Sequence, residues 1–106
     1  MLVMEDIDCP IGVFTHWLVW NIPADVREID AGELPPSAEI GLNGFGEVGY
    51  SGPCPPSGRH RYRFVLLALG CTLEAATSDR RDQVEAEAEG QVLARAELTG
   101  LYTAAD

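Results

Sequence analysis

The sequence predicts a mostly-β protein, a β-sandwich with one short peripheral helix near its C-terminal end. Three observations support this prediction. Apolar and polar residues alternate with a period of two in segments 14–22, 59–64 and 95–102, as they do in half-buried strands. Long connections rich in glycine and proline separate these segments, and a helical period occurs once, late in the chain. Few strands joined by long crossing loops are typical of packed sheets.

Composition limits both the size and the partners of the protein. At 106 residues, of which 46% are hydrophobic, the chain has room for a single domain, residues 1–106, with a modest core. The formal net charge is −10 and the basic residues are seven arginines without a lysine, which argues against binding nucleic acid through its phosphates. No apolar run approaches the roughly 20 residues of a membrane-spanning helix, so we expect no stable membrane insertion.

The cysteines and the N-terminus bear on the compartment. Cys9, Cys54 and Cys71 are an odd number without the spacing of a disulfide framework, which fits a reduced cytoplasm. The N-terminus lacks a basic segment followed by an apolar one, so we expect no secretory signal and a cytoplasmic location. We expect Cys71 to lie in the core.

The N-terminal elements are two strands. Residues 1–4 are apolar and β-prone, and the following Glu-Asp-Ile-Asp-Cys-Pro has the Asp and Pro spacing of a turn at a strand end. Segment 14–22 returns as a strand that Pro23 ends. Its alternation predicts one shared face for three residues: His16, Leu18 and Trp20.

A long connection and a stiff loop precede the next strand. Residues 24–48 form a polar, glycine-rich connection, too long for a hairpin and therefore either functional or a crossing between sheets. The proline-rich residues 49–58 predict a stiff, exposed loop. In the strand that follows, alternation places His60 and Tyr62 on one face, and residues 65–69 are apolar enough to be buried on both faces.

The C-terminal part predicts a helix and a closing strand. Ser78 is a plausible N-cap for a helix over 79–93, weakened by Gly90. Apolar residues recur there at i, i+4 and i+8, namely Val84, Ala88 and Val92. Residues 95–102 alternate again and predict the last strand.

Several motifs together point to one family. The stretch Gly-Tyr-Ser-Gly-Pro-Cys-Pro-Pro-Ser-Gly-Arg-His-Arg-Tyr (49–62) follows Glu-Asp-Ile-Asp-Cys-Pro (5–10) and Phe-Thr-His-Trp (14–17) in the chain. With Asn-Ile-Pro (21–23) and the ending 93–102, these segments resemble the phosphatidylethanolamine-binding protein family in its short bacterial and archaeal form, called Raf kinase inhibitor-like. The likeness covers essentially all of the chain, which is N-terminally short, because relatives normally carry several tens of residues before its start.

This resemblance implies a Greek-key-like β fold with a small anion pocket at one end. Carried over motif by motif, the pocket residues are Asp6, His16, Gly52, His60 and Tyr62. Two further residues of the same loops, Pro10 and Cys54, are assigned to the ligand-binding set. The chemistry is consistent, because imidazoles donate charge-assisted hydrogen bonds to phosphate, a carboxylate orients them, and glycine lets backbone approach a ligand.

Other interpretations of these residues remain open. A histidine in a strand is more often a hydrogen-bonded core residue, and Tyr62 is equally compatible with a core position. We expect Asp8 to form a turn and Arg61 to be a structural ion-pair partner rather than a ligand contact. Asp6, His16, His60 and Cys54 together have the donor chemistry of an open zinc site, although no paired ligand motif accompanies them.

The expected function is therefore a non-enzymatic binding module without a cofactor. It would hold phosphate or a phosphorylated head group such as phosphoethanolamine between the Asp6 loop and the Gly52–Pro56 loop. The alternative is a protease or kinase inhibitor that docks a protein partner at the pocket rim, as eukaryotic relatives do, and the third possibility is a metal-dependent hydrolase. The preceding strands of the family are missing, so either a second copy of the chain covers the exposed strands or the gene product starts upstream. Of these two we expect the homodimer.

Overall fold

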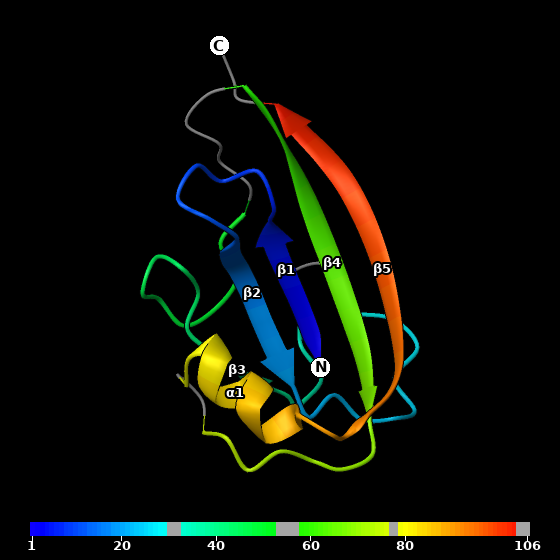
Figure 1. Ribbon diagram of the computed structural model, residues 1–106. Coiled ribbons are helices and arrows are strands. Elements are labelled where there is room, and N and C mark those ends of the chain that lie inside the picture. The colour runs from blue at the N-terminus through cyan, green and yellow to red at the C-terminus, as the bar shows by residue number, and fades with distance from the viewer. Residues whose placement is uncertain (30–32, 53–57, 77–78, 104–106) are drawn as a thin grey trace.

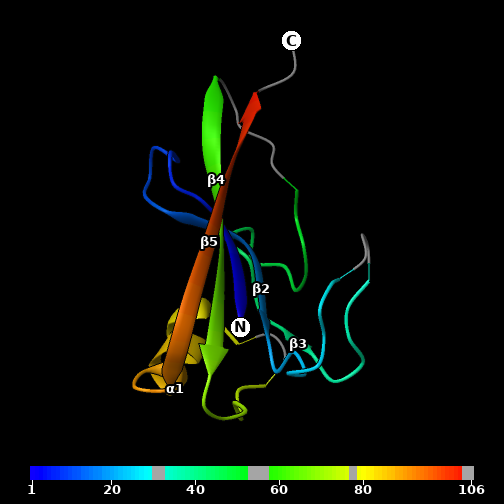
Figure 2. The same ribbon diagram turned by 90° about the vertical axis from the view of Figure 1, so that its right-hand side faces the viewer.

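The computed structural model describes residues 1–29, 33–52, 58–76 and 79–103. They form a five-stranded antiparallel sheet in the order β3-β2-β1-β4-β5 and one short helix, α1 (Figure 1). The bounds are β1 Leu2–Asp6, β2 Phe14–Trp20, β3 Glu39–Ile40, β4 Arg59–Leu69, α1 Arg81–Ala88 and β5 Val92–Thr103. The mostly-β class with a late helix is confirmed. Figure 2 shows α1 on one side of the sheet and the connection between β2 and β4 on the other, so in the described part of the chain the second layer consists of loops.

The core lies between α1 and the sheet. Its buried members come from β1, β2, α1 and the segment before the helix: Met1, Val3, Leu18, Trp20, Leu73, Val84 and Ala88. Val84 is fully buried and lies one turn before Ala88, so the i, i+4 pattern marks the face of α1 that contacts the sheet. This packing places the helix on the side of the sheet toward which Leu18 and Trp20 point.

The helix is shorter than the sequence pattern predicts. It ends at Ala88 rather than at residue 93, and Gly90 adopts φ 80°, a left-handed conformation in which glycine commonly terminates helices. Val92, which continued the helical period, is instead the first residue of β5. The proposed cap Ser78 lies outside the described residues, and Arg80 occupies the N-cap position.

Two burial predictions for β4 and its end are wrong. Residues 65–69 are not buried on both faces, because Leu66 is 50% exposed while Val65 is buried. Cys71 is exposed rather than in the core, and it is a free thiol. Strand β2 also ends two residues early, because Asn21 turns to φ 57° and its side chain bonds the backbone of Leu73 in both directions at 2.7 Å.

A bulge in β2 decides which face carries His16. Across β1 and β2, Met4 is opposite Trp17 but Glu5 is opposite Thr15, so His16 is an extra residue without a direct partner. The alternation reverses at this point. Thr15 faces α1, as Leu18 and Trp20 do, whereas the His16 ring lies against Tyr62 with 5.4 Å between ring centroids. The expectation that His16 shares the face of Leu18 and Trp20 is therefore wrong.

Within the described part of the chain, no helix has the length and apolar character required to cross a bilayer.

Candidate anion site

Three adjacent strands bring four polar or aromatic residues to the face of the sheet opposite α1. Asp6 ends β1, His16 occupies the bulge of β2, and β4 contributes His60 and Tyr62. Asp6 lies directly opposite Tyr62 in the β1–β4 register. All four are buried, with exposed fractions between 3% and 8%. We call this group the anion site; it contains four of the seven residues that the sequence assigned to the ligand.

Asp6 holds His60 in one orientation and one tautomer. The Nδ1 atom of His60 donates to Oδ2 of Asp6 at 2.7 Å, and the backbone N–H of Asp8 donates to Oδ1 of Asp6 at 2.9 Å. Both carboxylate oxygens are therefore engaged. Because the carboxylate can only accept, the hydrogen of a neutral His60 resides on Nδ1, which leaves Nε2 for a ligand.

His16 is held in the same manner by a backbone group. Its Nδ1 atom donates to the carbonyl oxygen of Ser51 at 2.8 Å, and the N–H of Ser51 donates to the carbonyl of His16 at 3.2 Å. A carbonyl oxygen can only accept, so the hydrogen resides on Nδ1 here too. Within the described residues neither histidine has a hydrogen bond at Nε2. The ring of Tyr62 contacts both, edge-on to His16 and nearly parallel to His60.

The loop after β1 is attached to β4 by an ion pair. Asp8 accepts three hydrogen bonds from Arg61, one from its backbone N–H and two from its guanidinium, at 2.8 to 2.9 Å. These side-chain and backbone hydrogen bonds hold the pKa of Asp8 well below its usual range, and the same side-chain bonds raise the pKa of Arg61. Arg61 is thus a structural ion-pair partner, as predicted, and Asp8 fixes the loop beside the Asp6–His60 pair.

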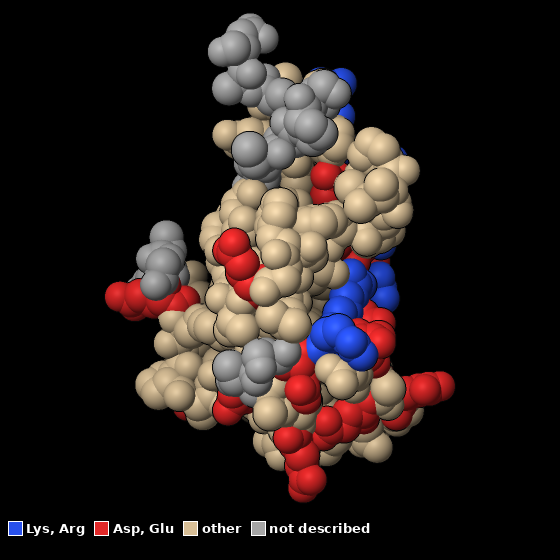
Figure 3. All heavy atoms as spheres, turned by 90° about the vertical axis from the view of Figure 1, so that its left-hand side faces the viewer, with Lys and Arg blue, Asp and Glu red and all other residues tan. Residues whose placement is uncertain are grey.

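A second arginine of β4, Arg63, is also ion-paired. Arg63 bonds the buried carboxylate of Glu5 on the α1 side of the sheet. On the side of the molecule shown in Figure 3, the larger group of arginine atoms adjoins acidic atoms, and large areas carry no charge. Arg61 and Arg63 are therefore both engaged in ion pairs with carboxylates.

The remaining three predicted positions differ from one another. The three described atoms nearest to a side-chain carbon at Gly52 all belong to Tyr50, the first at an ordinary 3.5 Å, so packing against them does not require glycine there. Pro10 is exposed in the β1–β2 loop, and the hydrogen bonds and ring contacts of the site do not involve it. Cys54 lies outside the described residues. In the described part of the chain Pro10 forms no hydrogen bond or ring contact with the histidines, and the assignment of Cys54 stays a prediction.

Sequence reasoning missed a supporting turn beside His16. Asn43 is 6% exposed, and its Oδ1 accepts the backbone N–H groups of Phe45 and Glu47 at 2.9 and 3.2 Å. This turn places the ring of Phe45 against those of Phe14 and His16, with centroid separations of 4.8 and 5.9 Å. The Asn-Gly pair at this position is a turn signal that could have indicated it.

Exposed apolar side chains occur in the two loops next to the site. They are Ile11 and Val13 before β2, and Phe45, Val48 and Tyr50 before residue 51, and each is about half exposed or more. Tyr50 contacts Trp17, and Phe45 contacts His16. We call these five residues the apolar rim. Among the described residues, no three Asp, Glu, His or Cys side chains gather as a set of metal ligands.

The family profile described as phosphatidylethanolamine-binding protein matches residues 1–103. The chain belongs to the phosphatidylethanolamine-binding protein family. Its relatives include a UPF0098 protein of Aquifex aeolicus (45% identical over 96% of this chain and 64% of the relative) and one of Methanothermobacter thermautotrophicus (44% identical over 95% and 70%). The chain therefore spans about two thirds of the length of these family members.

Two solved structures of family members resemble the fold closely. The putative phosphatidylethanolamine-binding protein homologue CT736 from Chlamydia trachomatis aligns with a TM-score of 0.88 at 36% identity, over 95% of this chain and 69% of that one. E. coli YbcL, described as a new member of the mammalian family, aligns with a TM-score of 0.85 at 32% identity, over 96% and 69%. Membership in this family supports a binding module as the general function of the chain.

Proposed function

We propose that this chain is a non-enzymatic binding module that holds a small anion. The ligand is phosphate or a phosphorylated head group such as phosphoethanolamine, and it lies between the Asp6 loop and the Gly52–Pro56 loop. One observation carries the proposal: two buried histidines share a face of the sheet, and each uses Nδ1 for a protein acceptor. The name of the family refers to a phosphorylated lipid and agrees with this ligand class.

Protonation of the histidines supplies the binding chemistry. An imidazolium donates from both nitrogens, so each protonated histidine retains its bond to Ser51 or Asp6 and offers Nε2–H to a phosphate oxygen. Such charge-assisted hydrogen bonds are about twice as strong as neutral ones. Burial of the rings in a low-dielectric environment strengthens the attraction further. Because both oxygens of Asp6 already accept hydrogen bonds, we expect the phosphate group rather than an attached amine to dominate the affinity.

Two conservative variants test this proposal. In His16→Asn and His60→Asn the amide NH2 takes the place of Nδ1 and can still donate to Ser51 or Asp6, while the atom corresponding to Nε2 is removed. The wild type should gain about 2.7 kcal/mol of stability at a phosphate concentration 100 times Kd. Each variant should lose most of this gain while its unfolding remains cooperative without phosphate. The measurement is thermal unfolding with and without phosphate, with sodium chloride at equal ionic strength as the control.

An undiminished phosphate effect in both variants would refute the assignment of the histidines. Inorganic phosphate and phosphoethanolamine are tested side by side. Equal affinities for the two ligands would support a site for the phosphate group alone.

The apolar rim favours a second candidate, an interaction protein that docks a protease or kinase at the edge of the site. Ile11 is 87% exposed and Tyr50 is 57% exposed, both in loops that adjoin the histidines. Exposed aromatic and aliphatic side chains next to a polar pocket are typical anchor residues of protein interfaces. The test is whether a protein that co-purifies with the wild type is lost from a Tyr50→Ser variant that still responds to phosphate. Loss of both properties would assign Tyr50 to the anion site instead.

A further inference from the structure

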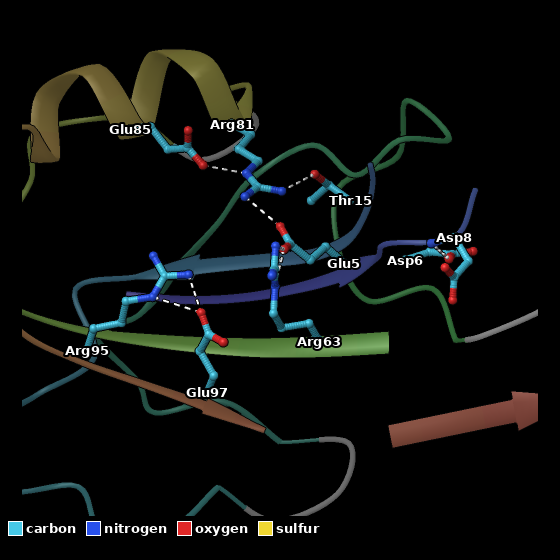
Figure 4. A network of polar contacts seen from close by, with 9 residues as sticks. All are labelled: Glu5, Asp6, Asp8, Thr15, Arg63, Arg81, Glu85, Arg95 and Glu97. Carbon is cyan, nitrogen blue, oxygen red and sulfur yellow. Dashed lines mark hydrogen bonds and ion pairs between the residues drawn. The ribbon is translucent and has the colours of Figure 1, made fainter. Parts of the chain in front are cut away.

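The face of the sheet opposite the anion site carries a buried ionic network centred on Glu5 (Figure 4). Glu5 is 1% exposed and accepts a hydrogen bond from Nε of Arg63 at 2.7 Å. Arg81, from the first turn of α1, forms an ion pair with the same carboxylate at 2.6 Å and another with Glu85. Burial alone lowers the pKa of Arg81, but its hydrogen bonds to Glu85 and Glu5 outweigh this effect and raise it. We call Arg81, Glu5, Thr15 and Arg63 the Arg81 network.

The Arg81 network spans the bulge that carries His16. Glu5 and Thr15 are direct partners across β1 and β2, next to the position where the register shifts. One guanidinium bonds both of them, because Nη2 of Arg81 contacts Glu5 and Nη1 donates to the hydroxyl of Thr15 at 3.1 Å. Arg81 therefore connects the two strands at the pair that immediately precedes the extra residue.

His16 depends on its neighbours for its position, since it has no direct partner in β1. On the site side, Ser51 bonds its ring and its carbonyl. On the α1 side, the preceding residue Thr15 is bonded by Arg81 through its hydroxyl and by the N–H of Gly44 through its carbonyl, at 2.7 Å. A bulge is a local departure from the ladder, and its geometry is set by such side bonds rather than by strand pairing.

We infer that Arg81 is a positioning residue for the anion site: it holds Thr15 against Glu5 and so keeps the bulge that presents His16 beside Tyr62. The inference rests on the proposed function in so far as it concerns ligand affinity. It makes α1 part of the anion site's architecture although α1 lies on the other side of the sheet. The competing explanation is that the network only attaches α1 to the sheet, in which case its loss would lower stability and leave the imidazole of His16 unchanged.

Two substitutions interrupt the link at different points, and each has a matched control. Thr15→Val removes the hydroxyl with little change of shape and leaves the ion pair of Arg81 with Glu5 intact; Thr99→Val makes the same change at an exposed position of β5. Arg81→Met removes the guanidinium, and Arg80→Met makes this change at the neighbouring residue, whose ion pair with Asp82 is largely exposed. If Arg81→Met fails to fold, Thr15→Val still decides the question.

The first readout needs no ligand. Nitrogen chemical shifts of both imidazoles, followed by NMR across a pH titration, should change for His16 in Thr15→Val and Arg81→Met and remain unchanged for His60. The second readout is the Kd for inorganic phosphate, which should rise in both variants. Thr15→Ser retains the hydroxyl, so its His16 nitrogen shifts and its Kd for phosphate should match those of the wild type, as should those of the two controls.

Unchanged His16 signals in Thr15→Val would overturn the inference, whatever the affinity. The failure of the proposed function is a separate result: if the wild type does not bind phosphate, the anion-binding proposal falls, whereas the His16 signals still decide whether Arg81 positions that side chain.

Discussion

The affinity of the anion site for a tetrahedral dianion should fall steeply as the pH rises. Both Nδ1–H groups are committed to protein acceptors, so a neutral imidazole presents only a lone pair at Nε2, which repels an anion. Binding at Nε2 therefore requires a proton on each ring. Once both rings are neutral in the free protein, binding takes up two protons, and mass action raises Kd about 100-fold per pH unit, or about tenfold if one histidine participates.

Two variants of the His60 pair should change this slope in different ways. His60→Asn removes one protonated donor, so Kd rises at every pH and the slope falls to about tenfold per unit. Asp6→Asn acts through the tautomer. The N–H of Asp8 keeps the amide oxygen in the place of Oδ1, which puts the amide NH2 against Nδ1 of His60. The hydrogen of a neutral His60 then moves to Nε2, where it can be donated to the anion without further protonation.

Asp6→Asn should therefore weaken binding at low pH, where the imidazolium charge of His60 is lost, and weaken it least at high pH. Isothermal titration calorimetry with sulfate is the appropriate assay, because the charge of sulfate, unlike that of phosphate, is constant near neutral pH. Titrations in buffers of different ionisation enthalpy count the protons taken up. A slope that both His60→Asn and Asp6→Asn leave unchanged would refute the assignment of both Nε2 atoms to the ligand.

The remaining predictions concern stability and association. Hydrogen bonds from Arg61 lower the pKa of Asp8, so the stability that they contribute is complete above the unfolded-state pKa of about 3.9 and is lost as the pH falls below it. In Asp8→Asn the urea midpoint should therefore fall less at acidic pH than in the wild type. The same fall of the urea midpoint in both proteins would contradict the pairing. Gly44→Ala places a carbon in steric conflict with the ring of Phe14 and should cost about 1–3 kcal/mol in urea unfolding. Gly100→Ala, whose added carbon has no neighbour within 4 Å, should change stability by less than about 0.5 kcal/mol, and equal effects of the two would exclude the clash. Every residue of β5 is exposed, so we expect the 106-residue chain to form a homodimer at micromolar concentration, and sedimentation as a single species of 11.5 kDa would contradict this.

Period-two alternation predicted the positions of β2, β4 and β5 well. At the start of β4 the alternation follows burial, since Arg59 and Arg61 are exposed while His60 and Tyr62 are buried. In β5 the sequence alternates although every residue of the strand is exposed. The same method failed where two patterns coincide. Val92 continues the helical spacing of Val84 and Ala88, but it belongs to the following strand. The turn at Gly90 separates the two elements, and a single glycine in a helical pattern does not reveal whether the helix continues.

The membership of the anion site was predictable only through the motifs, and its geometry was not. Asp6 and His60 are separated by 54 positions, and nothing in their own segments indicates that one bonds the other. The acceptor for His16 is the backbone carbonyl of Ser51. Because almost every residue carries such a carbonyl, the sequence does not indicate which one is the partner. The bulge likewise changes no composition: one extra residue in β2 reverses the alternation and moves His16 to the other face.

The placement of the two networks affects how substitutions near the site are interpreted. Neighbouring residues of a strand point to opposite faces of the sheet. In three places one residue therefore belongs to the Arg81 network and its neighbour in the chain to the anion site: Glu5 and Asp6, Thr15 and His16, and Arg63 and Tyr62. A variant of Glu5 that no longer binds phosphate would not place Glu5 at the ligand. Removing one partner of a buried ion pair typically costs about 3–5 kcal/mol, so such a variant should lose stability without ligand as well as affinity. His16→Asn or His60→Asn, which removes the atom corresponding to Nε2, should instead lose more affinity than stability. The ratio of the two losses, measured for each residue, therefore assigns it to one face of the sheet or the other.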